Sequence, residues 1–391
     1  MTDAVPQPRK LLMTADAVGG VWTYALELCA GLAARDVEIV LATMGPEPTR
    51  SQRQAVERMP HVQLECSDFR LEWMPDPWDD IELAGEWLLD LAEVHQPDLV
   101  HLNSYVHAAL PWAMPVVVVA HSSLWSWWQA VHGTDLPPEW HRYRAALAQG
   151  LSSADAVVAP TEAMLQSLHT YVDAHSEARS DTNPFQGTVI HDGMDVTPLR
   201  VDGRRAPLIF AAARLWDEAK NIRALDRAAR GLAWPVYVAG ELIAPHGQEV
   251  ELMQARALGP LSMTEMQQWL TRASIFASPA LYEPFGLSVL EAAIQGCALV
   301  LGDIPSLREV WGDAAWYVPP RDAEELARVL TSLIGDPHQL LTYATRAQAR
   351  ACRYSRSAMA QGYEEVYASL LSRRPLIGDS RTQARHMQRR S

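Results

Sequence analysis

The sequence predicts an α/β protein made of two parallel-sheet domains. Three observations lead to this prediction: a length of 391 residues, a repeated strand–helix–strand order, and a polar stretch over Val196–Pro207 between two such runs. Strands that alternate with helices form parallel sheets that are covered on both faces. We therefore expect one domain over residues 1–197, a second over 198–372 and a basic, polar tail over 373–391.

The first run alternates short apolar segments with amphipathic ones. Val116–Ala120 is almost wholly valine, which is typical of a strand buried inside a parallel sheet. The expected strands are Arg9–Thr14, Val37–Thr43, Asp98–Leu102, Val116–Ala120, Ala154–Thr161 and, with its turn, Thr188–Asp195. The expected helices are Trp22–Ala34 and Ile81–His95, and Asp173–Gly187 is expected as a loop.

The second run repeats this rhythm after the predicted linker. Its expected strands are Leu208–Ala213, Val236–Glu241, Ser274–Pro279, Ala298–Gly302 and Ala315–Val318. Its expected helices are Leu287–Gln295, Asp322–Leu333 and Tyr354–Ser372, and Arg214–Asn221 is expected to open a further helix.

Composition excludes several classes of protein. The net charge of −14 argues against a general nucleic-acid binder. The four cysteines form no CxxC pair, which indicates reduced thiols and neither a zinc site nor a disulfide framework. The first ten residues have no apolar signal core, and prolines interrupt the longest apolar run, near 108–120. We expect a cytoplasmic protein whose contact with a membrane is at most peripheral.

One loop and the helix after it suggest a ligand site. Gly286 lies at the start of the predicted helix, where unpaired amides attract an anion such as phosphate. Glu283 precedes this point, and Glu291 lies about 6 Å beyond Leu287 along the helix axis. Carboxylates repel phosphate, so we expect these two to bind hydroxyl groups, with a sugar on one side of the phosphate and a ribose on the other. The alternative is an ordinary strand–loop–helix with solvated glutamates.

Three features of the first run are also candidates for a site. Gly19-Gly20 joins a strand to a helix and tolerates an anion, although a glycine pair can simply serve packing, and it is not a GxGxxG or P-loop motif. His121 follows a predicted strand at the edge where open α/β sheets bind ligands, although a lone histidine there is often structural. Trp125, Trp127 and Trp128 can stack on an acceptor sugar or pack their helix onto the core.

Glu283-Pro-Phe-Gly-Leu-Ser-Val-Leu-Glu291, preceded by Ser-Pro-Ala-Leu-Tyr, resembles the signature of retaining glycosyltransferases of family 4. The resemblance runs from Lys10 to about Leu371. It implies the GT-B fold, in which two Rossmann-like domains face each other across a cleft and the last helix crosses back to the first domain. The C-terminal motifs match well, whereas the N-terminal half, where acceptors bind, resembles the family only in outline.

The resemblance also implies roles for individual residues. Arg214 and Lys220 match a basic pair that grips the donor diphosphate, and His121 matches a histidine close to the donor sugar. The implied catalytic residues are His121, Arg214, Lys220 and Glu283. The implied donor-binding residues are Gly19, Gly20, Arg214, Lys220, Leu261, Glu283, Phe285, Gly286, Leu287 and Glu291. The chain departs from the family in having Asn221 where a glycine is common, and Asp192 and Met194 where Asn-Gly-Val-Asp is common.

Together these features predict a retaining hexosyltransferase that uses a nucleoside diphosphate sugar and a hydroxyl acceptor. The sequence holds no Asp-x-Asp motif, so we expect neither a metal nor a cofactor beyond the donor. The donor base, whether UDP-, GDP- or ADP-linked, stays open, as does the acceptor, which can be a sugar, a glycan or a small metabolite. Alternatives are a nucleotide-sugar epimerase of the same fold and a non-catalytic, sugar-binding scaffold protein. A phosphorylase would need a pyridoxal-lysine site, which the sequence does not show.

Overall fold

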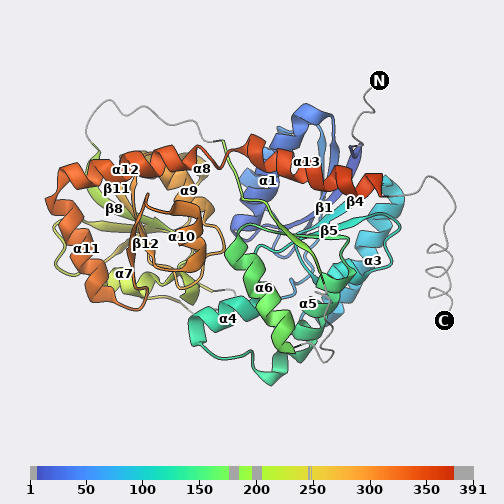
Figure 1. Cartoon of the computed structure of the whole chain (residues 1–391), viewed down its shortest axis with the longest axis horizontal. Coiled ribbons are helices and arrows are strands. Elements are labelled where there is room, and N and C mark those ends of the chain that lie inside the picture. Colours follow the sequence, from blue (N-terminus) through green and yellow to red (C-terminus); the bar gives the residue numbers. More distant parts are fainter. Residues whose placement is uncertain (1–6, 176–184, 196–204, 245–246, 248, 374–391) are drawn as a thin grey trace.

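The structure is a computed structural model that describes residues 7–175, 185–195, 205–244, 247 and 249–373 (Figure 1). Its described strands form two parallel sheets, one in each half of the chain, with helices on both faces. The first has the order β3-β2-β1-β4-β5-β6-β7 and the second the order β10-β9-β8-β11-β12-β13. This confirms the predicted α/β fold class. We call the first sheet with its helices the N-terminal domain and the second the C-terminal domain.

The N-terminal sheet contains β1 (Lys10–Asp16), β2 (Glu38–Met44), β3 (Val62–Cys66), β4 (Leu99–Leu102), β5 (Val116–Val119), β6 (Ala156–Ala159) and β7 (Gly187–Val189). Its helices are α1 (Gly20–Leu32), α2 (Arg50–Glu57), α3 (Trp78–His95), α4 (Leu124–His132), α5 (His141–Ser153) and α6 (Glu162–His175). All four residues of β5 are buried, because apolar clusters cover both faces of the sheet.

The C-terminal sheet contains β8 (Ala206–Ala212), β9 (Val236–Ala239), β10 (Arg256–Ala257), β11 (Ala273–Ser278), β12 (Ala298–Gly302) and β13 (Trp316–Val318). Its helices are α7 (Ile222–Ala228), α8 (Met263–Arg272), α9 (Leu287–Ile294), α10 (Pro305–Trp311), α11 (Ala323–Gly335) and α12 (Pro337–Ala351). Two further apolar clusters cover the two faces of this sheet.

The last described helix, α13 (Arg356–Ser372), lies against α1 of the N-terminal domain (Figure 1). Its buried residues Met359, Tyr363 and Tyr367 belong to the same apolar cluster as β1 and α1. The chain therefore returns to the N-terminal domain after completing the C-terminal sheet. The predicted domain boundary at residues 197–198, most of the predicted linker and the tail after residue 373 lie outside the described residues. The end of the predicted linker belongs to β8 instead. Most of the loop predicted over Asp173–Gly187 also lies outside the described residues, and its first three residues extend α6.

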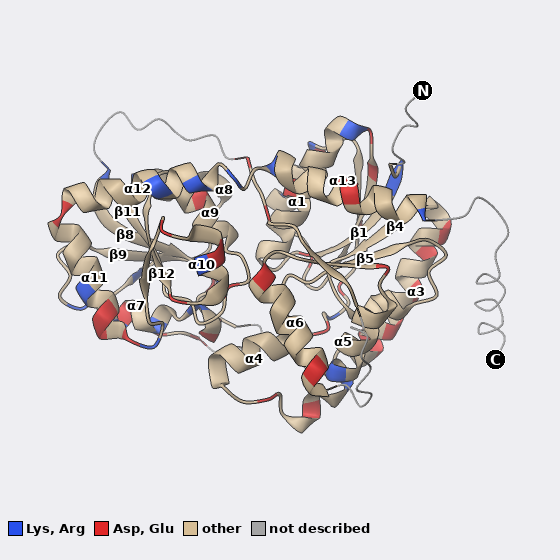
Figure 2. Ribbon diagram, viewed as in Figure 1, with Lys and Arg blue, Asp and Glu red and all other residues tan. Residues whose placement is uncertain are grey.

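Charge is distributed unevenly over the helices (Figure 2). Acidic residues mark α3, whose first turn holds Asp79 and Asp80, whereas α12 carries basic residues such as Arg346 and Arg350. Among the described residues, no helix is long and apolar enough to cross a bilayer. The net negative charge of the chain therefore coexists with local basic regions.

One predicted element is wrong in its type. Arg214–Asn221 was expected to open a helix, but it forms a loop with a 3-10 turn over Glu218–Lys220, and α7 begins only at Ile222. The Asp217 side chain accepts a hydrogen bond from the Ala219 amide and closes this short turn. Asn221 then takes a left-handed conformation with φ of 56°, which asparagine and glycine tolerate better than other residues. This also explains how asparagine can stand where the family often has glycine.

Candidate active site

Two loops of the C-terminal domain are joined at the carboxyl ends of β8 and β11. The Ala219 carbonyl accepts a hydrogen bond of 2.8 Å from the Leu281 amide. Just beyond this bond, the Lys220 ammonium lies 2.8 Å from a Glu283 carboxylate oxygen. Both side chains are largely buried, with exposures of 15% and 13%. The structure therefore brings together a predicted diphosphate-binding cation and a predicted sugar-facing carboxylate.

Helix α9 begins directly after this loop, and its N-terminus has no side-chain cap. Gly286 occupies the capping position with φ of 95°, a left-handed conformation that favours glycine. A Cβ atom at this position would lie 3.1 Å from Val289 and 3.3 Å from the Glu283 side chain. The first turn of α9 contains no acidic residue. Its unpaired amides are therefore suited to an anion.

The Gly-Gly loop of the N-terminal domain lies beside Arg214. A Cβ atom on Gly19 would be 3.8 Å from Cδ of Arg214, and α1 also starts at a glycine cap without a side-chain hydrogen bond. Asp16 lies at the end of β1; burial raises its pKa to about 6, while the Val18 amide and the Arg214 charge favour ionisation. Gly20 has open space around it. Arg214 thus lies beside the uncapped start of α1, one of the two helix starts predicted to face the donor phosphates.

His121 follows β5 and is held in a defined orientation. Its Nε2 atom lies 2.8 Å from Oδ1 of Asn103, whose amide nitrogen donates to the Thr14 carbonyl. Because Asn103 must present its oxygen to the ring, Nε2 of His121 carries the proton and Nδ1 is left as an acceptor. Burial, aided by His101, lowers the pKa of His121 to about 3. The ring is therefore neutral, and it packs edge-on against Tyr24 at 4.3 Å.

Two buried carboxyl groups, those of Glu291 on α9 and Asp192 after β7, have raised pKa values. Burial, and then the charge of Glu27 on α1, raises the pKa of Glu291 to about 7. Burial, and then the charge of Glu283, raises the pKa of Asp192 to about 7. The Asp192 side chain belongs to the turn after β7, where the family commonly has asparagine, and it is 5% exposed. A carboxyl group that is partly protonated near neutral pH resembles that amide in being able to donate a hydrogen bond.

The three predicted acceptor-binding tryptophans of α4 have different surroundings. Trp125 is 7% exposed, packs against Tyr171 and donates its indole N–H to Asp135, so it is a core residue with no free ring face to offer. Trp128 donates to Thr134 in the same domain. Trp127 donates across the domains to Asp217, at 2.9 Å. Helix packing, the alternative considered for these rings, therefore accounts for Trp125.

The remaining predicted donor-binding residues differ in what they can offer a ligand. The Phe285 ring is 2% exposed and packs against Tyr354, so only its backbone can face a donor. Leu261 and Leu287 are partly buried against the core cluster of the C-terminal domain. Leu287 also packs against the N-terminal cluster, because α9 lies next to α1.

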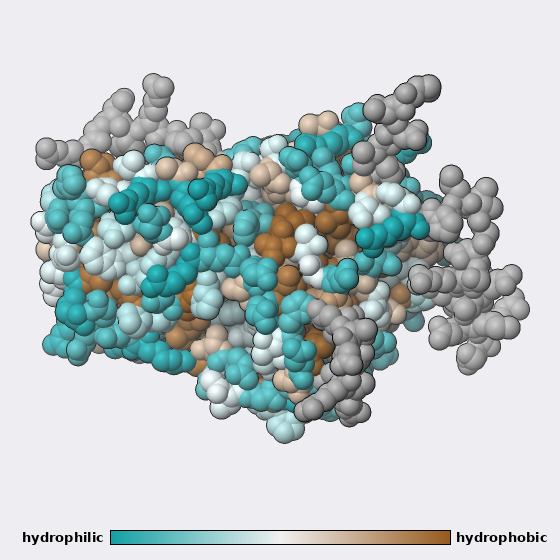
Figure 3. Space-filling view, in the orientation of Figure 1, coloured by the Kyte–Doolittle hydropathy of each residue, from teal (hydrophilic) through white to brown (hydrophobic). Residues whose placement is uncertain are grey.

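The two domains are bonded to each other around these loops. Thr161 donates to the Pro284 carbonyl at 2.9 Å, and Glu309 of α10 accepts from the first amides of α6, Glu162 and Ala163, at 2.8 and 2.9 Å. Arg321 donates to carbonyls in the last turn of α4. Figure 3 shows apolar side chains at the surface between α6 and α13. The starts of α6 and α4 are thus satisfied by protein groups, unlike those of α1 and α9.

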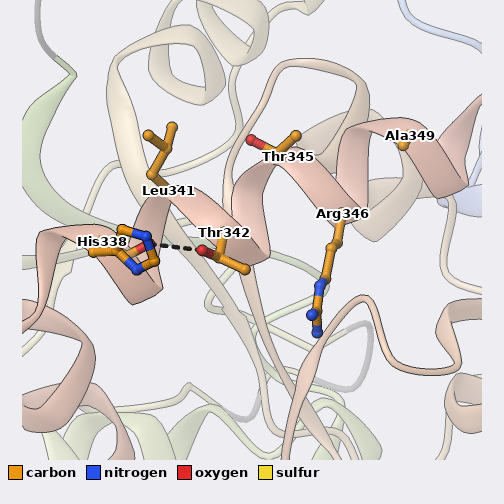
Figure 4. A pocket seen from close by; sticks show the side chains of 6 residues that line it. All are labelled: His338, Leu341, Thr342, Thr345, Arg346 and Ala349. Atoms are coloured by element: carbon orange, nitrogen blue, oxygen red, sulfur yellow. Dashed lines mark hydrogen bonds between the residues drawn. The ribbon is translucent and has the colours of Figure 1, made fainter.

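A surface hollow of 410 Å³ lies elsewhere, on the outer side of α12 (Figure 4). It is lined by side chains of that single helix, among them Leu341, Thr342 and Arg346, and Thr342 donates to the His338 carbonyl of its own helix. None of the predicted site residues lines it. Among the described residues, no group of three or more histidine, cysteine or acidic side chains is arranged to hold a metal ion.

Sequence reasoning missed several residues that the structure places next to the predicted ones. They are Asp16, Glu27, Asn103 and Asp217, and each contacts or electrostatically affects a predicted site residue. Asn103 could have been found, because it directly follows β4 at the carboxyl edge of the sheet. Glu27 gave no signal, because it lies inside an amphipathic helix like many solvated glutamates.

Two facing α/β domains with parallel sheets of this kind define the GT-B fold. Structural neighbours agree on the fold. The sucrose-phosphate synthase of Thermosynechococcus elongatus has a TM-score of 0.73 at 17% identity, covering 93% of this chain and all of that one. HepE of Anabaena, in complex with UDP and glucose, has a TM-score of 0.69 at 17% identity, covering 92% of this chain and all of that one.

Sequence comparisons give the family. Residues 18–179 match the model of Glycosyltransferase Family 4, and residues 206–336 match that of Glycosyl transferases group 1. The chain belongs to the family 4 glycosyltransferases, which confirms the resemblance that its motifs suggested.

Individual relatives differ in how much they share with this chain. A glycogen synthase of Mycobacterium tuberculosis is 32% identical over 182 residues, which is 42% of this chain and 43% of that protein. The match therefore spans less than half of that relative. The D-inositol 3-phosphate glycosyltransferase of Streptomyces bingchenggensis is 25% identical over 92% of this chain and 86% of its own length. These names describe the relatives, and they differ in the acceptor they imply.

Proposed function

We propose that this protein is a retaining glycosyltransferase that moves a hexose-type sugar from a nucleoside diphosphate sugar to a hydroxyl acceptor. The main support is the convergence of Arg214, the Lys220–Glu283 pair and the uncapped starts of α1 and α9. These features extend along the chain from Gly19 to Leu287, yet all belong to loops at the carboxyl ends of strands.

The charges fit the departure of a nucleoside diphosphate. When the bond between the sugar C1 and the phosphate oxygen breaks, the leaving group gains negative charge. Arg214, Lys220 and the α9 amides would stabilise this charge without having to reorganise. The Lys220–Glu283 pair would hold both groups in place, because the ammonium keeps two further N–H donors for the diphosphate and the carboxylate keeps further acceptor sites for a sugar hydroxyl.

The proposed transfer takes place on one face of the sugar. The acceptor oxygen attacks C1 from the side on which the diphosphate leaves, and the proton of the acceptor hydroxyl passes to the leaving phosphate oxygen. A new C1–O bond replaces the old one with the same configuration, and no protein nucleophile is needed. His121, which is neutral and presents Nδ1 as an acceptor, would bind a hydroxyl of the donor sugar.

Glu291 suits the ribose of the donor. It lies within α9, beyond the proposed phosphate site, whereas Glu283 precedes that site. The proposed roles of Gly19, Gly20, Leu261 and Leu287 are to approach the phosphates and the base through backbone atoms.

A screen of donors tests this proposal. The full chain is incubated with UDP-, GDP- and ADP-linked hexoses, with and without a mixture of hydroxyl acceptors, and release of the diphosphate is measured. We expect release from one donor, a product with retained anomeric configuration by NMR, and activity that survives EDTA. Inversion would refute the retaining mechanism, and loss with EDTA that manganese restores would refute the metal-free one. Interconversion of donor sugars without transfer would favour the epimerase.

A further inference from the structure

Asp217 lies at the junction between the donor loop and the N-terminal domain. Its side chain is 3% exposed, and both of its oxygens accept hydrogen bonds. Oδ1 accepts from the Ala219 amide at 3.0 Å and from the Trp127 indole at 2.9 Å, and Oδ2 accepts from Nη2 of Arg214 at 2.9 Å. This single carboxylate thus joins a side chain of the N-terminal domain to the proposed diphosphate-binding arginine.

Trp127 reaches Asp217 from α4, a helix that the C-terminal domain holds at several points. Besides the indole contact, Arg321 donates to the carbonyls of Ala130 and Val131, in the last turn of α4. The Arg321 contact has no connection to Arg214. A third contact lies at the N-cap of α4, where the Ser123 amide donates to the Tyr282 hydroxyl at 3.4 Å. Of the Trp127 and Arg321 contacts, the Trp127 contact reaches the partner of Arg214.

Arg214 has few other constraints. Its side chain is 36% exposed and lies over Trp216, with the guanidinium carbon 5.4 Å from the ring centroid. A guanidinium has five N–H donors in a fixed plane, so binding one edge to Asp217 orients the donors that remain. The direction in which Arg214 presents those donors thus depends on where the Asp217 carboxylate is held.

We propose that Asp217 is a positioning residue that couples the docking of α4, through Trp127, to the orientation of Arg214 for the donor diphosphate. The inference rests on the proposed function, because it assigns Arg214 to a diphosphate. If α4 moves away, Oδ1 loses a donor and the buried carboxylate can turn away from Arg214. Coupling between two binding events is reciprocal, so a bound nucleoside diphosphate should in turn favour the docked position of α4.

Binding measurements test this coupling without requiring an acceptor. The dissociation constants of UDP, GDP and ADP are measured by calorimetry for the full-length parent chain, and the tightest of the three becomes the probe. Trp127→Phe keeps a ring and removes only the N–H donor. We expect Trp127→Phe to raise the dissociation constant of the probe about fivefold to tenfold, and we expect Asp217→Asn to raise it at least as much. In a chain that already carries Asp217→Asn, Trp127→Phe should raise the dissociation constant further by less than twofold.

Arg321→Gln is the matched control, because it removes a bond between the same helix and domain that does not involve Asp217. We expect it to bind the probe within twofold of the parent. Thermal midpoints verify that each variant folds. If Trp127→Phe does not fold, the effect of Asp217→Asn on the dissociation constant is measured in the parent and in Arg214→Ala. In Arg214→Ala, Asp217→Asn should raise the dissociation constant less than twofold.

Two kinds of failure are distinguishable. A parent chain that binds none of the three diphosphates refutes the proposed function, and this inference with it. If the parent binds one diphosphate, three results would refute this inference alone. Trp127→Phe could bind the probe as tightly as the parent does, or it could weaken binding by the same factor with and without Asp217→Asn. Arg321→Gln could also weaken binding as much as Trp127→Phe does. If Asp217→Asn is compared in the parent and in Arg214→Ala, an equal rise of the dissociation constant in both would also refute the inference.

Discussion

Helices α9 and α4 both begin beside the other domain, but their first turns are satisfied in opposite ways. Helix α4 starts after Ser123, whose hydroxyl accepts a hydrogen bond from the Ser126 amide at 3.0 Å. Helix α9 starts after Gly286 and has no side-chain cap. A capped first turn stabilises its own helix, whereas an uncapped one leaves amides for a ligand. The difference separates a helix that serves docking of the domains from one suited to an anion.

The largest expected effect concerns the two cations of the loop after β8, which is hydrogen-bonded to the loop before α9. Replacing Arg214 or Lys220 by alanine should lower kcat/KM by about 10²–10³, or about 3 kcal/mol, because each would stabilise charge on the leaving diphosphate. Steady-state kinetics with the donor found in the screen measure this. Turnover at the parental rate in the double variant would show that these two cations do not bind the diphosphate.

The two glutamates on either side of the α9 start should differ from each other. A hydrogen bond to a charged group contributes about 1.5–3 kcal/mol, so Glu291→Gln should weaken binding of the free nucleoside diphosphate roughly tenfold or more. Glu283→Gln should leave that binding nearly unchanged and lower turnover of the intact donor. Calorimetry with the diphosphate alone separates the roles. Equal losses, or a loss only in Glu283→Gln, would mean that the ribose and sugar sides are reversed.

The raised pKa of Glu291, about 7, predicts a pH dependence of binding. If ribose hydroxyls bind the ionised form, diphosphate affinity should rise about tenfold from pH 6 to pH 8 through this group. Glu291→Gln provides the control, because it keeps the titration of the diphosphate itself and loses that of Glu291. Identical pH profiles of the two proteins would contradict the assignment.

The same group affects the stability of the ligand-free protein. A carboxyl whose pKa is higher in the folded than in the unfolded chain retains its proton in the fold, so its contribution to stability falls as pH rises from about 4.5 to about 7. Glu291→Gln should therefore raise the melting temperature relative to the parent at pH 8 and change it little at pH 4. Thermal unfolding at the two pH values measures this.

The smallest expected effect belongs to the capped helix. Ser123→Ala removes the cap of α4 and should lower the free energy of unfolding by about 1 kcal/mol. Diphosphate affinity should stay within about twofold, since the hydroxyl bonds only with Ser126. Chemical denaturation and calorimetry on the same preparation measure both. A large loss of affinity would mean that the two helix starts are not functionally distinct.

Local patterns explain how much of the fold could be predicted. The valine run of β5 and the periodic apolar positions of α1 and α11 belong to segments whose structure is set mainly by burial on one or two faces. Prediction failed where a side chain redirects the backbone, as Asp217 does in the turn before α7. It also gave no bounds for the helix of the three tryptophans, which the structure shows as α4.

The sequence by itself determined the α/β class, the family and the positions of the candidate residues Arg214, Lys220, Glu283 and Glu291, because these depend on local periodicity and on motif spacing. Only the tertiary structure decided which partners these residues have. Lys220 meets Glu283 over 63 positions, because β8 and β11 are neighbours in one sheet, and Trp127 meets Asp217 over 90, because the two domains pack against each other. Burial likewise depends on the complete fold, and so therefore do the raised pKa of Glu291 and the lowered pKa of His121.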